Sequence, residues 1–255
     1  KALEKQINNL PVDVKYCKRC VMSNQRPRIV FDDEGVCSVC RYTEEKDTVI
    51  DWQARERELE RLLDTYRSKD GSFDVIVPGS GGKDSAYVAH QLKYKYGMHP
   101  LTVTWAPTVY TSLGYKNIQN FIHSGFSNVT AYPNGELHRK LARLAFEEVG
   151  DIFVPFIFGQ FCYPFHMALR FGIKLVFYGE NGDAEYGGDP NYNYCSHMPA
   201  EEFARVYWKG TDINEMIDYG LKYKNYVSQS DFKKSDLVFY GLPPIEKMKA
   251  LGVEM

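Results

Sequence analysis

The chain lacks any long apolar run, any large excess of charge of one sign, any internal repeat and any low-complexity tract. No apolar run approaches the roughly 20 residues that a membrane-spanning helix needs. The charged first residues, Lys1 to Lys5, lack the apolar core of a signal peptide. The formal charge of −2 argues against a large nucleic-acid-binding surface, which usually carries a basic excess, but leaves room for a local basic patch. We therefore predict a cytoplasmic protein without a membrane span.

Cysteine is also scarce, with six residues whose spacing does not indicate the disulfide framework of a secreted protein. Cys17-Lys-Arg-Cys20 and Cys37-Ser-Val-Cys40 form two CxxC pairs separated by 16 residues. This spacing is typical of a four-thiolate zinc site, and four thiolates leave no coordination position for water, so we predict a structural zinc ion. Two redox CxxC motifs are the alternative, which is disfavoured because neither pair lies at a predicted strand–helix junction.

The chain divides into four predicted regions. Residues 28–31 have the pattern of a short strand and residues 32–35 that of a tight turn, which together predict a zinc ribbon over residues 1–45. Apolar side chains at helical spacing over residues 51–67 predict a helix within a connecting region, 46–72. The main domain then covers residues 73–199, and a helical C-terminal region covers residues 200–255.

Strands and helices alternate through the main domain. Strands are predicted at 73–77, 101–105, 129–132 and 174–178, and helices at 84–96, 115–123, 137–149 and 161–171. Near-continuous apolar strands separated by helical crossovers predict an α/β fold, with a parallel sheet covered by helices on both faces. Further helices are predicted in the C-terminal region, at 200–207, 213–219 and 245–251. Ligands of such folds bind beyond the carboxyl ends of the strands, where the chain order reverses.

A glycine-rich segment, Pro78-Gly79-Ser80-Gly81-Gly82-Lys83-Asp84-Ser85, directly follows the first predicted strand and opens a helix. A strand that ends in such a turn aims backbone N–H groups and a positive helix end at one point, which suits a phosphate chain. Glycine allows positive φ and close approach of the backbone to the anion. The segment is not a Walker A loop, because Asp84 stands where that motif has Ser or Thr directly after the lysine.

The residues Ser80-Gly81-Gly82-Lys83-Asp84-Ser85 resemble the SGGxDS loop of the PP-loop ATP pyrophosphatases. Those enzymes cleave ATP between the α and β phosphates, hold the pyrophosphate in this loop and transfer AMP to a substrate oxygen. The resemblance implies that ATP is bound by the residues Gly79, Ser80, Gly81, Gly82, Lys83, Asp84 and Ser85.

A second glycine-rich segment follows the fourth predicted strand: Gly179-Glu180-Asn181-Gly182-Asp183-Ala184-Glu185-Tyr186-Gly187-Gly188. Its carboxylates are hard oxygen ligands of the kind that a magnesium–pyrophosphate complex needs. The segment resembles the second nucleotide loop of asparagine synthetase and other PP-loop enzymes. By that resemblance Gly179 and Glu180 contribute to nucleotide binding, Asp84 and Asp183 are candidate magnesium ligands, and Glu180 is a candidate for orienting the acceptor or receiving a proton.

Taken in order, the motifs look like those of the N-acetyl sugar amidotransferases, which serve O-antigen (lipopolysaccharide), pseudaminic acid and legionaminic acid pathways in bacteria. The resemblance covers nearly the whole chain and rests on these segments: Tyr16-Cys17-Lys18-Arg19-Cys20-Val21-Met22, Arg26-Pro27, Phe31-Asp32-Asp33-Glu34-Gly35-Val36-Cys37-Ser38-Val39-Cys40, Ile50-Asp51-Trp52, the SGGKDS loop and Gly179-Glu180-Asn181-Gly182. Members of that family usually continue past this C-terminus, so we expect part of the acceptor site to lie outside this sequence.

The resemblance implies an ATP-dependent, AMP-forming amidotransferase with Lys83, Asp84, Glu180 and Asp183 as catalytic residues. The acetamido oxygen of a nucleotide sugar attacks the α-phosphate, and ammonia then displaces AMP to leave an acetamidino group. Lys83, the loop amides and magnesium stabilise the charge on the phosphates. The sequence shows no glutaminase nucleophile with an attached His and acid, so the family pattern implies a glutaminase and a cyclase-like barrel as ammonia-supplying partners.

Two other functions stay open at this point. A tRNA-thiolating PP-loop enzyme would need a basic surface and a sulfur-carrying cysteine, for which Cys162 and Cys195 are the available residues. A non-catalytic scaffold, with a ribbon that binds partners, would not bind ATP. His197, two residues after Cys195, is the one histidine whose position suggests a functional role, and a structural role is favoured even there.

Overall fold

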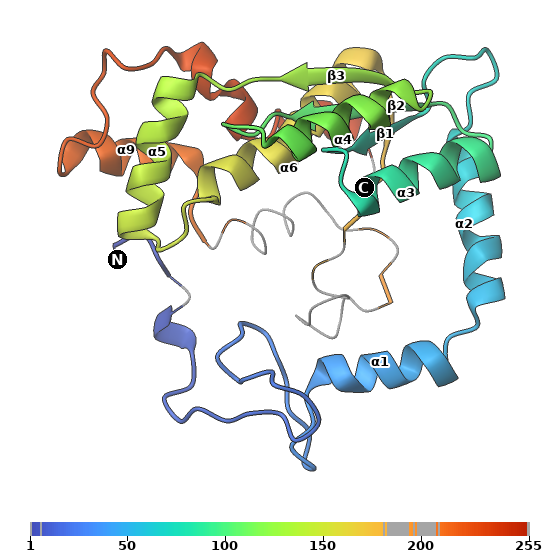
Figure 1. Ribbon diagram of the computed structural model, residues 1–255, viewed down its shortest axis with the longest axis horizontal. Coiled ribbons are helices and arrows are strands. Elements are labelled where there is room, and N and C mark those ends of the chain that lie inside the picture. Colours follow the sequence, from blue (N-terminus) through green and yellow to red (C-terminus); the bar gives the residue numbers. More distant parts are fainter. Residues whose placement is uncertain are drawn as a thin grey trace. The chain divides into compact units, whose positions relative to one another are not determined.

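The computed structural model describes residues 2–5, 7–180, 182, 194, 195, 197, 208 and 210–253 (Figure 1). The chain forms two compact units. The sheet unit consists of Lys1–Glu4, Leu63–Gly179 and Pro199–Met255, and the cysteine unit consists of Lys5–Leu62 and Glu180–Met198. The predicted C-terminal helix at 200–207 lies outside the described residues.

The sheet unit contains a four-stranded parallel sheet, which confirms the predicted α/β class. Its strands are β1 (Val75–Pro78), β2 (Pro100–Trp105), β3 (Ser127–Ala131) and β4 (Leu175–Val176), in the order β3-β2-β1-β4. Val77 pairs with Thr102 between β1 and β2, and Ile76 pairs with Val176 between β1 and β4. Each strand lies at or within two residues of its predicted bounds, although β4 is only two residues long.

Helical crossovers connect the strands, as parallel pairing requires. They are α3 (Lys83–His90), which continues into a π-helical turn, η2 (Gln91–Lys95), then α4 (Ser112–His123), α5 (Gly135–Glu148) and α6 (Val154–Phe171). Thr111 caps α4, since its side chain accepts a hydrogen bond from the Gly114 amide, and Asn134 caps α5 in the same way. Helix α6 begins seven residues before the predicted start at 161, because its first two turns are apolar all round and show no helical period.

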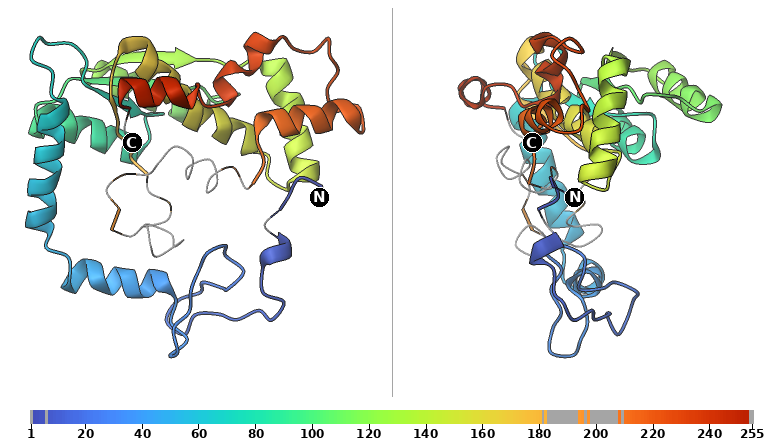
Figure 2. Two further views of the ribbon diagram at one scale, coloured as in Figure 1. Left: turned by 180° about the vertical axis from the view of Figure 1, so that it is seen from behind. Right: turned by 90° about the vertical axis from the view of Figure 1, so that its left-hand side faces the viewer.

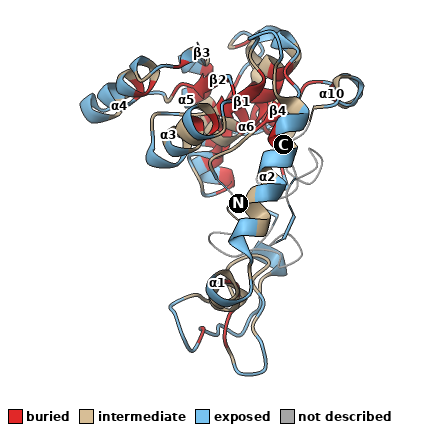
Figure 3. Cartoon of the chain, turned by 90° about the vertical axis from the view of Figure 1, so that its right-hand side faces the viewer, coloured by how far each residue is buried: buried red, intermediate tan, exposed pale blue. Residues whose placement is uncertain are grey.

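Both faces of the sheet are covered. Ile76 belongs to the main core cluster together with side chains of α5 and α6. Its neighbours Val75 and Val77 point to the opposite face and are fully buried there. Buried residues gather along the strands of the sheet (Figure 3). The chain runs from β1 through β2 to β3 and then returns to the far side of β1, so right-handed crossovers place α3 and α4 on one face and α5 and α6 on the other.

The end of the chain packs on the face covered by α5 and α6 (Figure 2). Helix α9 (Ile213–Lys222) contacts α5, and the 3-10 helix η4 (Lys234–Tyr240) and helix α10 (Ile245–Leu251) contact α6. The buried Tyr240 hydroxyl lies 2.8 Å from Nδ1 of His138, and burial lowers the pKa of this histidine. A structural role of this kind accounts for His138.

The cysteine unit differs from the predicted ribbon. Residues 28–31 form no strand, and Arg28 has a φ of +65°, which a strand does not allow. Two isolated bridges, Tyr16 with Ser23 and Phe31 with Cys37, close tight hairpins instead. The predicted turn at 32–35 is confirmed by the hydrogen bond from the Gly35 amide to the Asp32 carbonyl.

Three helical segments complete the first part of the chain: η1 (Ile7–Asn9), α1 (Ser38–Thr48) and α2 (Trp52–Tyr66). Helix α2 agrees with the prediction over 51–67 to within one residue. Helix α1 was not predicted, and it begins within the second CxxC pair, at the residue after Cys37. The second pair of thiols is therefore presented by the start of a helix rather than by the turn of a ribbon.

A buried carboxylate joins distant parts of the sheet unit. Glu148, 4% exposed, accepts hydrogen bonds from Nζ of Lys224 at 2.6 Å, the hydroxyl of Tyr226 at 3.0 Å and the amide of Ala2 at 3.3 Å. The Lys224 ammonium, followed by the Ala2 amide and the Tyr226 hydroxyl, outweighs the opposing effect of burial and lowers the pKa of Glu148 from 4.5 to about 2.

We expect Glu148 to make the stability of the sheet unit depend on acid pH. A carboxyl group whose folded-state pKa is lowered stabilises the fold above its unfolded pKa, and that contribution is lost as the pH falls from 4.5 toward 2. Relative to Glu148→Gln, the wild type should be more stable by roughly 2 kcal/mol at pH 7, since Lys224 is partly solvated and its pairing is screened. Urea unfolding at pH 7 and pH 3 measures this, with Glu60→Gln on the exposed face of α2 as control. An equal difference at both pH values would contradict the assignment.

Candidate functional site

The glycine-rich loop connects β1 to α3 and is anchored to β2 at its first residue. The Gly79 amide donates a hydrogen bond to the Val103 carbonyl at 2.9 Å. The Thr104 hydroxyl donates one to the Gly79 carbonyl at 2.7 Å. The chain therefore leaves the sheet at a fixed point, with both peptide groups of Gly79 held by the neighbouring strand.

Close packing against α4 leaves no room for a side chain at Gly81 and little at Gly79. Gly81 has a φ of +80°, and a Cβ there would lie 2.7 Å from the Ile118 amide nitrogen and 2.8 Å from the Asn117 carbonyl carbon of α4. A Cβ on Gly79 would lie 3.0 Å from Cε1 of Phe121, also on α4. Gly82 differs, because a Cβ there would meet nothing closer than Oγ of Ser80 at 3.6 Å. The loop thus lies directly on the backbone of α4.

Helix α3 begins at the end of this loop with Gly82 as its N-cap residue and no side-chain cap. The first turn of a helix directs its amide N–H groups outward without intrahelical acceptors, and the helix dipole makes this end positive. Ser80, Gly82, Lys83 and Asp84 are exposed around it. The loop can therefore offer donors and positive potential to an anion, which was the basis of the sequence prediction.

The first residue of the second predicted loop, Gly179, lies next to the glycine-rich loop. Gly179 follows β4, and a Cβ at this residue would lie 2.9 Å from the Ser85 amide nitrogen and 3.0 Å from the Asp84 carbonyl carbon. The chain reverses its direction across the sheet between β1 and β4, so the two segments meet at the topological switch point, where open α/β sheets bind ligands. Ordinary side chains at position 179 would push the two segments apart.

The predicted catalytic residues are only partly described. Nζ of Lys83 lies 2.6 Å from Oδ1 of Asp84, and the Lys83 side chain is 87% exposed. An exposed ion pair of this kind contributes little to stability and rearranges readily. Glu180 is exposed and directly follows Gly179, whereas Asp183 lies outside the described residues. The predicted pairing of Asp84 and Asp183 around magnesium therefore stays a prediction.

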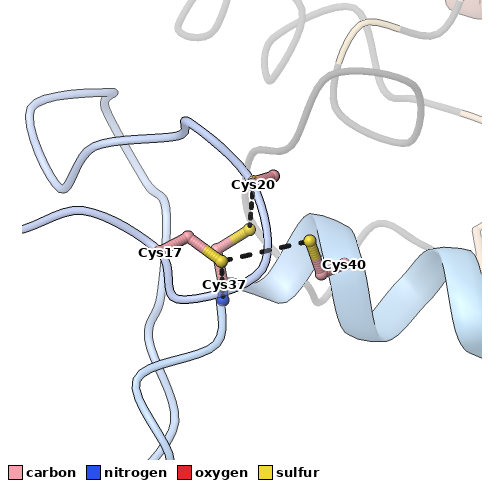
Figure 4. A group of neighbouring side chains, drawn as sticks. All are labelled: Cys17, Cys20, Cys37 and Cys40. Atoms are coloured by element: carbon pink, nitrogen blue, oxygen red, sulfur yellow. Dashed lines mark hydrogen bonds between the residues drawn. The ribbon is translucent and has the colours of Figure 1, made fainter.

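The four predicted zinc ligands lie together in the cysteine unit (Figure 4). The sulfur atoms of Cys17, Cys20, Cys37 and Cys40 all lie within 4.8 Å of one another. Sγ of Cys17 is 4.0 Å from Sγ of Cys40, and Sγ of Cys20 is 3.7 Å from Sγ of Cys37. A tetrahedral ion with metal–sulfur bonds of about 2.3 Å separates its ligands by about 3.8 Å. The four thiols therefore match the dimensions of one tetrahedral metal site.

Local hydrogen bonds favour the thiolate form of Cys17 in this cluster. Burial opposes ionisation of Cys17, but the amides of Arg19 at 3.4 Å and Cys37 at 3.2 Å donate to its sulfur and lower its pKa to about 6. Burial and the neighbouring thiols raise the pKa of Cys40 to about 12. Four thiolates at such distances repel one another unless a cation lies between them, so the cluster is suited to a metal ion rather than to four free thiols.

The backbone around the cluster is fixed by short-range contacts. The Lys18 amide donates to the Gly35 carbonyl at 3.0 Å, which joins the first knuckle to the turn. Nε of Arg41 on α1 donates to the Asp32 carboxylate at 2.7 Å, which joins this turn to the helix. Cys17, Val36 and Cys37 form a small core with five partly buried neighbours: Met22, Ile29, Phe31, Val39 and Cys40.

Of the two remaining cysteines, Cys162 is fully buried in α6 and burial raises the pKa of its thiol. It is packed as a core residue and is not accessible to a substrate in this structure. Cys195 and His197 are exposed. Among the described residues, none of the helices is both long and apolar enough to span a membrane.

The polar residues of β2 and β3 that lie next to the glycine-rich loop were not identified from the sequence. Thr102 and Thr104 are fully buried and alternate along β2 with the apolar Leu101, Val103 and Trp105. Asn128 on β3 donates to both hydroxyls at 2.9 Å. Two threonines on one face of a buried strand were a signal that this face carries polar partners.

No family model matches this chain, and no curated protein matches it significantly.

Proposed function

We propose that this chain is an ATP-dependent, AMP-forming amidotransferase that converts the acetamido group of a nucleotide sugar into an acetamidino group. The observation that carries the proposal is the meeting of two segments at the sheet's switch point. The SGGKDS loop lies there on the backbone of α4, and Gly179 lies against the first turn of α3. Resemblance of the motif order to the N-acetyl sugar amidotransferases supplies the substrate class.

In this proposal the amides of the loop and the first turn of α3 bind the β and γ phosphates of ATP. Lys83 turns from Asp84 toward the phosphates and balances the charge that develops on the departing pyrophosphate. Asp84 and Asp183 hold magnesium, and Glu180 orients the acetamido group. Glu180 directly follows Gly179, whose own backbone lies against the first turn of α3.

The reaction has two steps. The acetamido oxygen attacks the α-phosphorus, the bond from that phosphorus to pyrophosphate breaks, and an O-adenylated imidate forms. Ammonia then adds to the imidate carbon, the carbon–oxygen bond to AMP breaks, and the amidine product gains a positive charge at neutral pH. A partner glutaminase with a cyclase-like barrel supplies the ammonia. The four cysteines hold a structural zinc ion, which stabilises the cysteine unit and takes no part in the reaction.

A direct assay tests the proposal. The protein is incubated with ATP, magnesium, ammonium salt and acetamido nucleotide sugars, and AMP release and product charge are followed. AMP should appear only when the sugar is present. AMP release with tRNA and none with any acetamido sugar would favour the thiolation alternative, for which the buried Cys162 is poorly suited. Absence of ATP binding in a thermal-shift measurement would favour a scaffold.

Two substitutions in the loop should remove AMP formation without unfolding the protein. Asp84→Asn and Ser80→Ala change exposed side chains, so the unfolding temperature should stay within a few degrees of the wild type. AMP formation should fall by roughly 100-fold or more, because phosphate and metal contacts act mainly in the transition state. Asp218→Asn on α9 and Ser112→Ala on α4 change exposed residues of the same types outside the loop and serve as controls. Normal turnover in both loop variants would show that the loop has another role.

A further inference from the structure

A chain of polar side chains runs from the edge strand β3 to the glycine-rich loop. The Thr130 hydroxyl donates to Oδ1 of Asn128 at 2.6 Å. Nδ2 of Asn128 donates to the hydroxyls of Thr102 and Thr104, each at 2.9 Å. These two threonines are 0% and 1% exposed, so water does not compete for their hydrogen bonds. The chain ends at Gly79, the first residue of the loop.

The direction of each bond follows from its neighbours. The Ser127 and Gly79 carbonyls can only accept, so the hydroxyls of Thr102 and Thr104 use their single protons there. Both hydroxyls must therefore accept from Nδ2 of Asn128, which leaves its Oδ1 to accept from Thr130. Each of these two threonine hydroxyls therefore accepts a hydrogen bond from Asn128 and donates one to a backbone carbonyl. Thr102 donates to the Ser127 carbonyl at 2.9 Å, within the sheet, and Thr104 donates to the Gly79 carbonyl at 2.7 Å. Of the two threonines, Thr104 is therefore the one that links Asn128 to the loop by a hydrogen bond.

Holding the Gly79 carbonyl also orients the next amide. The carbonyl and the N–H of a trans peptide point in opposite directions. With the Gly79 carbonyl directed at Thr104 on β2, the Ser80 N–H points away from β2. Ser80 itself is exposed, on the side where the loop can meet a ligand. The bond of the Gly79 amide to the Val103 carbonyl keeps the preceding peptide from rotating as well.

We propose that Thr104 is a positioning residue for the glycine-rich loop: its hydroxyl, oriented by Asn128, sets the peptide between Gly79 and Ser80 so that the Ser80 N–H binds a phosphate oxygen of the nucleotide. This inference rests on the proposed function of the loop. Thr104 touches neither nucleotide nor acceptor and acts through the backbone alone.

Thr102 provides a matched control. It has the same side chain, lies on the same face of the same strand two residues away, is equally buried and shares the amide of Asn128. The Thr102 hydroxyl donates its hydrogen bond to the Ser127 carbonyl rather than to the loop. A general loss of buried hydrogen bonds would therefore affect both threonines, whereas a role in positioning the loop belongs to Thr104.

The experiment compares Thr104→Val, Thr102→Val and Thr104→Ser in the full chain. Binding of inorganic pyrophosphate with magnesium is measured by calorimetry, AMP formation by its kcat and KM, and stability by thermal unfolding. Both valine variants should lower the unfolding temperature to a similar extent. Thr104→Val should also weaken pyrophosphate binding by about tenfold and lower kcat more than it raises KM, because a misplaced loop donor acts most in the transition state. Thr102→Val should stay within about twofold of the wild type, and Thr104→Ser should restore binding to within about threefold.

Equal effects of the two valine variants on pyrophosphate binding would overturn the inference, as would wild-type binding by Thr104→Val. If that variant does not fold, Thr104→Ala removes the same hydroxyl without adding a methyl group and is measured in its place. The two proposals fail in distinguishable ways. A wild-type protein that binds neither pyrophosphate nor ATP would refute the proposed function together with this inference. Normal wild-type binding that is insensitive to position 104 would refute this inference alone.

Discussion

Gly81→Ala should lower AMP formation by roughly 100-fold, whereas Gly82→Ala, one residue later, should leave most of it. At position 81 an added methyl group would lie 2.7–2.8 Å from backbone atoms of Asn117 and Ile118, and the φ of +80° is unfavourable for alanine. Backbone atoms cannot move aside as a flexible side chain can. At position 82 the nearest atom to a new methyl group would be 3.6 Å away, at ordinary contact distance.

The expected loss has two parts. The left-handed conformation costs roughly 1–2 kcal/mol with a Cβ present, and overpacking against α4 costs roughly 1–3 kcal/mol more. Part of this strain is relieved when the loop moves away from α4, and a displacement of about 1 Å lowers the rate by roughly 100-fold. Gly81→Ala should therefore reduce both stability and kcat/KM, and the losses should be far larger than in Gly82→Ala.

Thermal unfolding and AMP release, measured well below the unfolding temperature of both variants, test this expectation. A folded Gly81→Ala protein with normal turnover would show that the close approach of the loop to α4 is not needed for activity. Equal losses in the two variants would show that the loop is sensitive to any added side chain, and that the contact with α4 is not decisive.

Cys37→Ser should remove the bound metal and unfold the cysteine unit. Cys37 is completely buried, its sulfur lies 3.7 Å from that of Cys20, and its amide donates to the sulfur of Cys17. A serine hydroxyl is a poor zinc ligand and leaves a polar group in the small core. Structural zinc contributes roughly 10 kcal/mol or more to the folding of small modules, which is more than a core of three buried and five partly buried residues can supply.

Metal analysis of the purified wild type should find about one zinc per chain, as a closed tetrahedral site requires, and Cys37→Ser should lose nearly all of it. Limited proteolysis should then cut within residues 5–62, and a strong chelator should produce the same pattern in the wild type. Cys195→Ser changes an exposed cysteine outside the cluster and should keep full zinc content. Unchanged zinc in Cys37→Ser, or a wild type whose four cysteines form disulfides, would contradict a four-thiolate site.

The parallel sheet could be predicted because its strands are short apolar runs with helical patterns between them. Val75 to Val77 and Leu101 to Trp105 are buried on both faces, and such strands are recognisable from composition alone. The approach of Gly179 to α3 followed from the rule that ligand loops lie beyond the carboxyl ends of the strands. The clustering of Cys17, Cys20, Cys37 and Cys40 followed from their spacing in the sequence.

Other features depend on contacts that no local pattern reveals. Helix α1 is highly charged, its apolar positions are few, and it starts at a CxxC pair, so nothing in its periodicity marked it as a helix. Residues 29–31 are apolar, as in a strand, but the positive φ of Arg28 and the single bridge at Phe31 take the place of a regular strand there. The role of Thr104 depends on Asn128, which lies 24 residues away in sequence on the adjacent strand.

The composition of the cysteine unit bears on how the protein is prepared for experiments. Residues 180–198 belong to this unit, where the Tyr194 hydroxyl donates to the Glu45 carboxylate and the Tyr194 ring meets Tyr42 edge-on, with centroids 6.1 Å apart. A shortened version that starts at residue 63 keeps the whole glycine-rich loop but lacks Glu45 and Tyr42, the two residues that Tyr194 contacts. Such a truncation would leave the Tyr194 ring and hydroxyl without these two contacts, so the two units are best expressed together.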